Sequence, residues 1–317
     1  MINNFEEDIS MATNDERQQA QAQSDSNREQ VGYFKRPITP ELQLERKVMG
    51  GQPLGIASQV LDSTHAKVVF ASYFHPALCI LHLELTPNDP RNAAKYKVEW
   101  VRGVQYGDKS RRIFPDFFDD DHNRAHCVNF GPDNTLWVTR NGDREIFEIM
   151  PPPPGQDKWL PGGRIVFPGP DGEKRMIHSC LRSGNHVYTI ESPWSLRDWT
   201  LRKYEHFRSQ TGEQGLREIV GDVFPAPLLD YVYGLALEAG TNESFLCITD
   251  VRSPELPGIY RFQGGSWRCA LFGLTGNGLC LLPDGSLITT YYGESSPDPL
   301  GSPGALYLVP SEKISKR

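Results

Sequence analysis

The sequence lacks the features that mark membrane, secreted and nucleic-acid-binding proteins. No stretch approaches the roughly 18 apolar residues of a membrane-spanning helix, and the first residues, MINNFEEDIS, lack the basic and apolar regions of a secretory signal. Basic residues are not in excess either, because 33 Lys and Arg stand against 40 Asp and Glu. These absences predict a cytoplasmic protein that binds neither membrane nor nucleic acid.

Several motifs that would identify an enzyme class are also missing. The chain has no GxSxG, no P-loop, no GxGxxG after a predicted strand and no HExxH. No amphipathic helical stretch is long enough to support an α/β topology. None of the six cysteines forms a CxxC pair, and they stand beside apolar neighbours, as in ALCILHL and GLCLLP. We therefore predict reduced, buried thiols rather than disulfides.

The composition of the 317 residues is that of a folded chain with many turns. Apolar residues make up 38%, and the 29 glycines and 25 prolines are spread along the chain, as expected for short strands joined by tight turns. Residues 1–30 differ, because they carry seven acids, two arginines and almost no large apolar side chains. We expect 1–30 to be a disordered tail and 31–317 to form one nearly neutral domain.

From about residue 40 the chain repeats a pattern of short strands. Each repeat has an apolar run, a turn, a second apolar run ending in a polar residue, a variable loop and a third strand. The repeats span 53–85, 126–151, 177–207, 233–264 and 277–310, and a further short strand follows four of them. This pattern predicts an all-β fold, a single β-propeller of four-stranded blades, with five repeats detected and six blades possible. Gln43–Gly50 would close the ring by pairing with Ala305–Pro310.

Aligning the repeats places polar and aromatic residues at equivalent positions around the predicted channel. Such residues can converge on one site although they lie about fifty positions apart, or they can simply be solvated at a wet channel mouth. One ring precedes the first strands, and a second ring ends the second strands: Leu54, His126, His178, Tyr233 and Asn277, then Tyr73, Arg140, Glu191, Asp250 and Tyr291.

Four of these residues carry the chemistry that we predict. His126 and His178 can transfer protons near neutral pH or bind a metal, although each can also be a structural histidine. Asp250 can orient a histidine, act as an acid, bind a cation or cap a turn. Arg140 can hold a carboxylate, an enolate or a tropolonate, or form an ion pair. The remaining ring residues are candidate substrate contacts.

One long inter-blade segment, FPDFFDDDHNRAH, combines phenylalanines with acidic residues. Its three consecutive aspartates resemble an oxygen-rich cation site but lack the spacing of an EF-hand. We therefore favour a solvated acidic loop over a cation site. Phe118 and its two neighbouring phenylalanines are instead candidates for a lid over an apolar substrate.

The units YGLAL…FLCITD…GIYRF and NGLCLLPDGSLITT resemble the repeats of gluconolactonase, senescence-marker and strictosidine-synthase-like propellers. The resemblance covers roughly residues 45–310 and implies the fold. The lactonase branch binds a divalent metal through Glu, Asn and Asp. Asp250 matches the Asp, whereas Tyr233-Gly234 replaces Asn-Gly and Gln52-Pro53-Leu54 replaces Glu-Gly-Pro. The two departures argue against a metal site, and we predict no metal and no cofactor.

In its size, its polar N-terminal segment and the style of its repeats, the chain also resembles the fungal hetero-Diels–Alderases that build tropolonic sesquiterpenoids. This resemblance implies dehydration of a hydroxymethyl tropolone to an o-quinone methide, followed by cycloaddition with a humulene-type alkene. No cofactor is implied. A nearly neutral channel with histidines and aromatic side chains suits this chemistry, because acids assist loss of water and apolar walls orient the alkene.

Three hypotheses therefore remain open at the level of sequence. The first is a cofactor-independent enzyme acting on a small apolar or aromatic metabolite, most specifically a dehydrating hetero-Diels–Alderase. The second is a metal-dependent lactonase or hydrolase of the senescence-marker type. The third is a non-catalytic propeller that binds a ligand or a protein.

Removal of residues 1–30 should leave the melting temperature nearly unchanged, because a segment with so few apolar side chains buries little surface. Thermal denaturation of the full-length and truncated proteins checks this. A fall of more than a few degrees would show that the tail docks on the folded domain.

Overall fold

The computed structural model describes residues 53–72, 77–85, 95–102, 104, 125–140, 144–168, 175–193, 199–210, 213–219, 232–238, 244–249, 257–291 and 305–314. The predicted tail, 1–30, and the predicted closing strand, Gln43–Gly50, lie outside these ranges.

The described strands form five antiparallel sheets, each built from consecutive strands of the chain. We call these sheets blades 1 to 5. Blade 1 contains β1 (Pro53–Val60), β2 (His65–Ser72), β3 (Ala77–Glu84) and β4 (Lys95–Arg102). Blade 2 contains β5 (Ala125–Phe130), β6 (Leu136–Arg140), β7 (Glu145–Met150) and β8 (Leu160–Val166). Blade 3 contains β9 (Arg175–Ser183), β10 (His186–Pro193), β11 (Thr200–Arg208) and β12 (Gln214–Glu218).

Blade 4 contains β13 (Val232–Leu237), β14 (Phe245–Thr249), β15 (Gly258–Gln263) and β16 (Ser266–Phe272). Blade 5 contains β17 (Gly278–Leu281), β18 (Leu287–Tyr291) and β19 (Ala305–Val309), three strands within the described residues. Within the described ranges there are also two short 3-10 helices, Pro132–Asn134 and Ser311–Lys313. No helix in the described part of the chain has the length and apolarity needed to cross a membrane.

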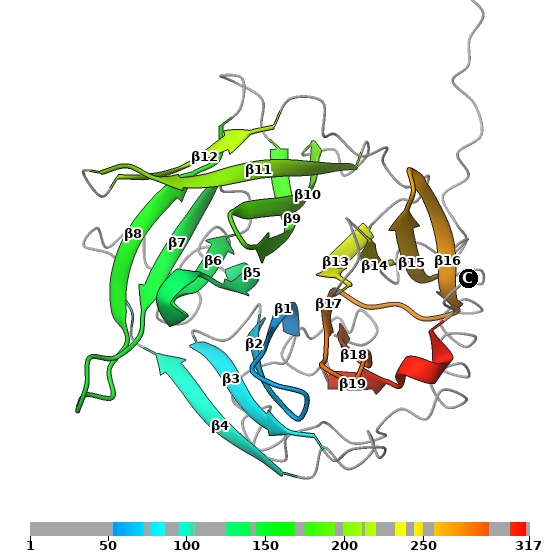
Figure 1. Ribbon diagram of the computed structural model, residues 1–317, viewed down its shortest axis with the longest axis horizontal. Helices are drawn as coiled ribbons and strands as arrows, with labels where there is room; N and C mark the ends of the chain where they lie inside the picture. The colour runs from blue at the N-terminus through cyan, green and yellow to red at the C-terminus, as the bar shows by residue number, and fades with distance from the viewer. Residues whose placement is uncertain are drawn as a thin grey trace, which may run out of the picture.

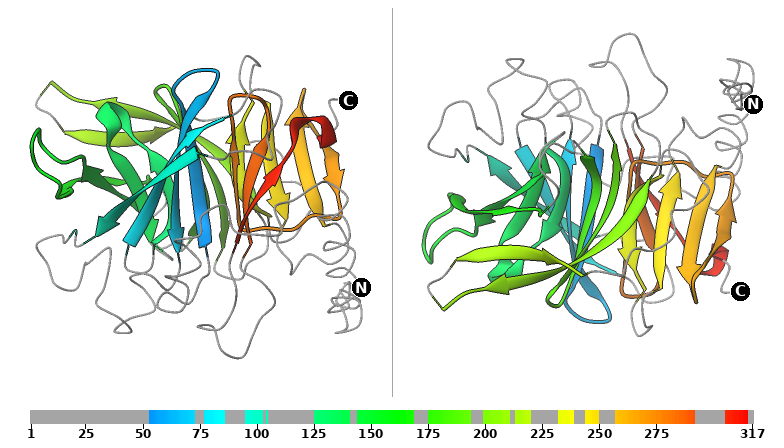
Figure 2. Two further views of the ribbon diagram at one scale, coloured as in Figure 1. Left: turned by 90° about the horizontal axis from the view of Figure 1, so that it is seen from below. Right: turned by 90° about the horizontal axis from the view of Figure 1, so that it is seen from above.

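The five blades are arranged as a closed ring, a five-bladed β-propeller (Figure 1). The first strand of each blade lies innermost. Strand β1 contacts β5, β5 contacts β9, β9 contacts β13, β13 contacts β17, and β17 contacts β1 again. The side views show the strands running between the two faces of the ring (Figure 2). The predicted propeller is thus confirmed, and the number of blades is five.

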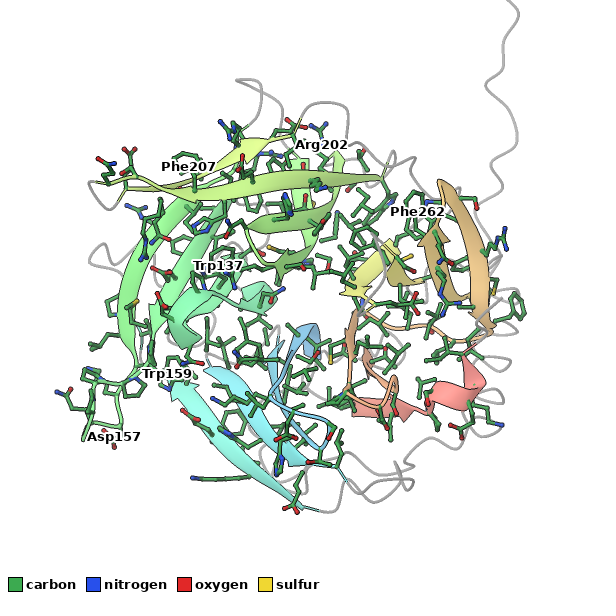
Figure 3. All side chains as sticks on the ribbon, in the orientation of Figure 1. Trp137, Asp157, Trp159, Arg202, Phe207 and Phe262 are labelled. Carbon is green, nitrogen blue, oxygen red and sulfur yellow. The ribbon has the colours of Figure 1, made fainter. Side chains whose placement is uncertain are left out.

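The core consists of five apolar layers, each lying between two neighbouring blades. Alternation along a strand sends successive side chains into different layers. In β2, Val68 and Phe70 pack toward blade 5, whereas Val69 and Ala71 pack toward blade 2. Large aromatic side chains fill these layers, such as Trp159 between blades 1 and 2 and Trp137 between blades 2 and 3 (Figure 3).

Five of the six cysteines are buried in these layers, and none of the six is in a disulfide, as predicted. Cys269 is the exception, because its position on the outermost strand β16 leaves it exposed.

Two glycines allow the inner strands to approach each other closely around the channel. A Cβ atom on Gly55 would lie 2.6 Å from the carbonyl oxygen of His126 in the next blade. Gly234 has φ +58°, and a Cβ atom there would lie 2.7 Å from the backbone nitrogen of Leu279. A small ring of five blades thus depends on residues without side chains where backbones meet.

Gly234→Ala should destabilise the fold more than Gly264→Ala. Gly264 has a similar φ, +59°, but an added Cβ would meet nothing within 4 Å. The left-handed conformation alone costs an alanine about 1–2 kcal/mol, and the clash with blade 5 should add about 1–3 kcal/mol. Chemical denaturation of the two variants measures the difference. Equal losses would show that the inner strands can separate without cost.

Candidate functional site

Backbone irregularities recur at the predicted inner ring position. The register of β5 against β6 passes from Ala125 to Cys127 and omits His126. The register of β9 against β10 likewise omits His178, because Ile177 pairs with Glu191 and Ser179 pairs with Ile190. The register also shifts beside Leu54 in blade 1 and beside Tyr233 in blade 4. A β-bulge leaves a residue unpaired and redirects its side chain. Four of the five blades therefore interrupt the inner strand where the sequence alignment places candidate site residues.

The bulges bring together three of the five residues of the inner ring. The ring centroids of His126 and His178 lie 5.8 Å apart, and Tyr233 lies 6.2 Å from His126 and 5.2 Å from His178. Trp199 completes the group, with its indole 4.1 Å from the imidazole of His178 and 5.5 Å from Tyr233. We call these four residues, from blades 2, 3 and 4, the imidazole cluster.

The imidazole cluster is shielded from solvent and has polar partners. The exposed fractions are 7% for His126, 3% for His178, 5% for Tyr233 and 2% for Trp199. Ser192 Oγ lies 2.7 Å from Nε2 of His178. Two imidazoles and a phenol within one shielded group can donate, accept and relay protons, and the indole and phenol rings supply apolar surface beside them.

Cys127 adjoins the cluster but is not a nucleophile. Its Sγ atom lies 3.5 Å from Nδ1 of His126, and its thiol donates to the carbonyl oxygen of Ile177 at 3.6 Å. Burial raises the pKa of Cys127 to about 12, so the thiol stays protonated near neutral pH. Cys127 therefore acts as a small polar contact for His126.

The structure gives partial information on the other predicted site residues. Asn277 is buried at the matching position of blade 5, and its backbone N–H donates to the carbonyl of Thr290. Arg140 pairs through its backbone with Ala125, directly beside His126. The structure describes the backbone but not the side chains of three predicted residues, namely Arg140, Leu54 and Tyr291. Asp250, Tyr73 and Phe118 lie outside the described residues, as do the three consecutive aspartates.

Glu191 is placed in a buried ion pair between blades rather than in the imidazole cluster. Its carboxylate accepts from Arg144 Nη1 at 3.0 Å, from Thr189 Oγ1 at 2.8 Å and from the Tyr204 hydroxyl at 2.6 Å. Glu191 is 0% exposed. Burial acts to lower the pKa of Arg144, but the charge and hydrogen bond of Glu191, together with Tyr204, more than offset this effect, and the pKa lies above its usual value. The substrate contact that we predicted for Glu191 is replaced by a role in joining blade 3 to blade 2.

Sequence reasoning missed Trp199 and Ser192. Trp199 precedes a third strand, and the alignment of repeats considered only the first and second strands. Ser192 follows Glu191 directly, so the alternation of β10 turns it to the opposite side of the blade, toward His178. Strict period-two reading of IESP would have placed Ser192 on the same side of β10 as the buried Ile190, opposite to Glu191. It would not have shown the bulge at His178, which brings the imidazole to Ser192.

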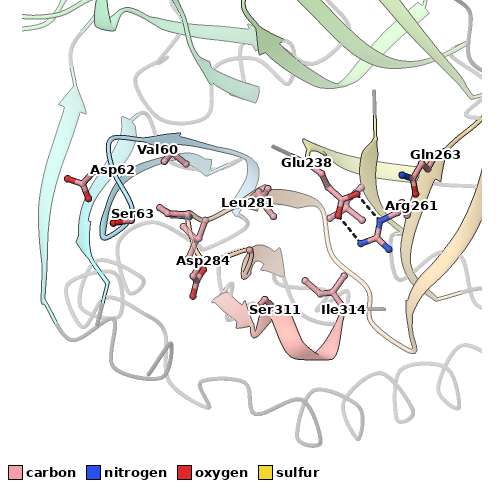
Figure 4. A pocket seen from close by; sticks show the side chains of 14 residues that line it. Val60, Asp62, Ser63, Glu238, Arg261, Gln263, Leu281, Asp284, Ser311 and Ile314 are labelled. Carbon is pink, nitrogen blue, oxygen red and sulfur yellow. Dashed lines mark hydrogen bonds and ion pairs between the residues drawn. The ribbon is translucent and has the colours of Figure 1, made fainter. Parts of the chain in front are cut away.

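A hollow of about 640 Å³ lies at the other face of the ring, where β1, β13 and β17 end (Figure 4). Leu281 and Ile314 form part of its apolar lining. Its charged groups are used internally, because Arg261 binds both carboxylate oxygens of Glu238 at 2.8 Å and Asp284 caps the turn before Ser286. Polar residues line the hollow as well, but no histidine is among its described lining residues. The imidazole cluster, with two imidazoles and a phenol, is therefore the better candidate for acid–base chemistry.

No group of three or more His, Cys, Asp or Glu side chains that could hold a metal occurs among the described residues. This finding does not cover Asp250, the residue that matches the lactonase metal ligand.

Comparison with known proteins shows no family. No family profile matches the chain, and no curated protein matches it. Among solved structures, one described as a glycoside hydrolase is similar over 71% of this chain and 50% of its own, with 11% identity and a TM-score of 0.37. The Nup170 N-terminal domain–Nup53 complex of Chaetomium thermophilum is similar over 80% of this chain and 44% of its own, with 10% identity and a TM-score of 0.32. The chain thus spans about half the length of these structures or less.

Glu191→Gln should destabilise the protein by about 3–5 kcal/mol, because it leaves the Arg144 guanidinium without its buried counter-charge. Glu205→Gln is the matched control, since the Glu205–Arg217 pair is largely exposed and its loss should not be measurable. Chemical denaturation of both variants tests this. Similar stabilities for both variants would contradict the structural role of Glu191.

Proposed function

We propose that the protein is a cofactor-independent enzyme that dehydrates a hydroxymethyl tropolone to an o-quinone methide and joins it to a terpene alkene by a hetero-Diels–Alder cycloaddition. The convergence of His126, His178 and Tyr233 with Trp199 is the observation that supports this proposal most directly. The resemblance of the chain to tropolonic hetero-Diels–Alderases supports the choice of substrate.

The proposed reaction needs only proton donors, proton acceptors and a shaped apolar surface. The carbon–oxygen bond of the hydroxymethyl group breaks, and the departing hydroxyl takes a proton and leaves as water. The tropolone hydroxyl gives up its proton to a base, so the two transfers balance. The resulting heterodiene then adds to the alkene, forming one carbon–carbon and one carbon–oxygen bond without gain or loss of atoms.

The imidazole cluster contains side chains suited to each of these tasks. One imidazole, of His126 or His178, supplies the proton to the departing hydroxyl, and the other accepts the tropolone proton. The Tyr233 hydroxyl can hydrogen-bond the carbonyl oxygen of the quinone methide and lower the energy of the heterodiene. The low exposure of the cluster keeps water away from a reactive intermediate.

His126→Ala and His178→Ala should fold normally and lose about 10²–10⁴-fold in turnover, the usual loss for a positioned acid or base. Tyr233→Phe should have a milder effect, because it keeps the aromatic ring and removes only the hydroxyl. The assay combines purified protein, a hydroxymethyl tropolone and humulene, with the cycloadduct measured by mass spectrometry.

His65→Ala is the matched control for these variants, since His65 is exposed on the β1–β2 hairpin and should be dispensable. Full turnover in both cluster variants would refute the acid–base role. Binding of the tropolone without formation of product by the wild-type protein would instead favour a non-catalytic propeller.

A further inference from the structure

Ser192 is held against His178 within the buried part of blade 3. The hydroxyl oxygen lies 2.7 Å from Nε2 of the imidazole, and the exposed fractions of the two residues are 0% and 3%. Ser192 lies on β10 and His178 on the neighbouring strand β9. Because β9 has a bulge at His178, Ser192 pairs with Met176. The contact is therefore built into the backbone register of the blade.

Two further features limit the movement of this pair. The indole of Trp199 lies over the imidazole of His178 at 4.1 Å, with an interplanar angle of 44°. On the other side of β10, Glu191 is fixed by Arg144 and Tyr204, so the residue next to Ser192 is anchored to blade 2. A serine on an anchored strand presents its hydroxyl to one nitrogen of one imidazole.

We infer that Ser192 is a positioning residue that sets the ring orientation and the tautomer of His178. A hydroxyl that donates to Nε2 places the ring proton on Nδ1, whereas a hydroxyl that accepts from Nε2 keeps the proton on Nε2. Either arrangement favours one tautomer over the other. The inference rests on the proposed function for its catalytic meaning, since an acid–base histidine must present the correct nitrogen to its substrate.

The direct test is the tautomer ratio of His178, measured by ¹⁵N NMR of the imidazole nitrogens in full-length protein without added ligand. The His178 signals are assigned by their loss in His178→Asn. Ser192→Ala should shift the tautomer ratio by about two- to tenfold, the range that one intramolecular hydrogen bond contributes. Ser179→Ala is the matched control, because Ser179 is also buried, adjoins His178 in sequence and should leave the ratio unchanged.

Ser192→Cys provides a second variant of similar size with a weaker hydrogen bond, and its tautomer ratio should lie between those of the wild type and Ser192→Ala. An unchanged ratio in Ser192→Ala overturns the inference, as does an equal change in Ser179→Ala. Failure of both Ser192 variants to fold also overturns it, because it would assign Ser192 to folding rather than to positioning.

The same variants separate this inference from the proposed function. With hydroxymethyl tropolone as substrate, Ser192→Ala should lower kcat and leave KM nearly unchanged, because a misplaced proton affects the chemical step rather than binding. If the wild type forms no product, the proposed function fails, while the NMR experiment still decides whether Ser192 positions His178. A change confined to KM would contradict the positioning role.

Discussion

Burial of both faces of every sheet is the constraint on which this structure depends. A single antiparallel sheet commonly buries one face and leaves the other in water. Here neighbouring side chains of β14 enter different layers, with Phe245 and Cys247 packed toward blade 3 and Leu246 and Ile248 toward blade 5. No blade can complete its own core, so each requires a neighbour on both sides, and closure of the ring satisfies all of them together.

This constraint explains how much of the fold was predictable. Segments such as FLCIT have four consecutive apolar residues before a polar one, and the same pattern recurs in five repeats, so the propeller and its inner strands could be found in the sequence. The blade number was less certain, because the loops vary in length and a degenerate sixth repeat could not be dismissed from spacing alone. The contact of β1 with β17 settles it, since a closed ring leaves no place for another blade.

The candidate site was predictable only in part, for reasons that are local to the backbone. Equivalent positions in the repeats predicted His126, His178 and Tyr233, and these residues do converge. The bulge opposite β10, however, shifts the pairing by one residue, and it is Ser192 rather than Glu191 that meets His178. A bulge has no sequence signature as clear as a turn motif, so errors of one residue are expected where inner strands are irregular.

The ion pair of Glu191 and the imidazole cluster are linked through the same two blades. His126 belongs to blade 2 and His178 to blade 3, and Arg144 and Glu191 join these two blades directly. Glu148 of blade 2 also accepts from Gln214 of blade 3 at 3.1 Å, and Arg182 of blade 3 lies over the Trp137 ring of blade 2. Apolar layers tolerate small shifts between sheets, whereas paired charges and hydrogen bonds have one favourable register. The polar contacts between blades 2 and 3 therefore favour one register of the two blades and, with it, one separation of the two imidazoles. The proposed reaction needs that separation to be constant, because the two imidazoles must reach two different oxygens of one substrate.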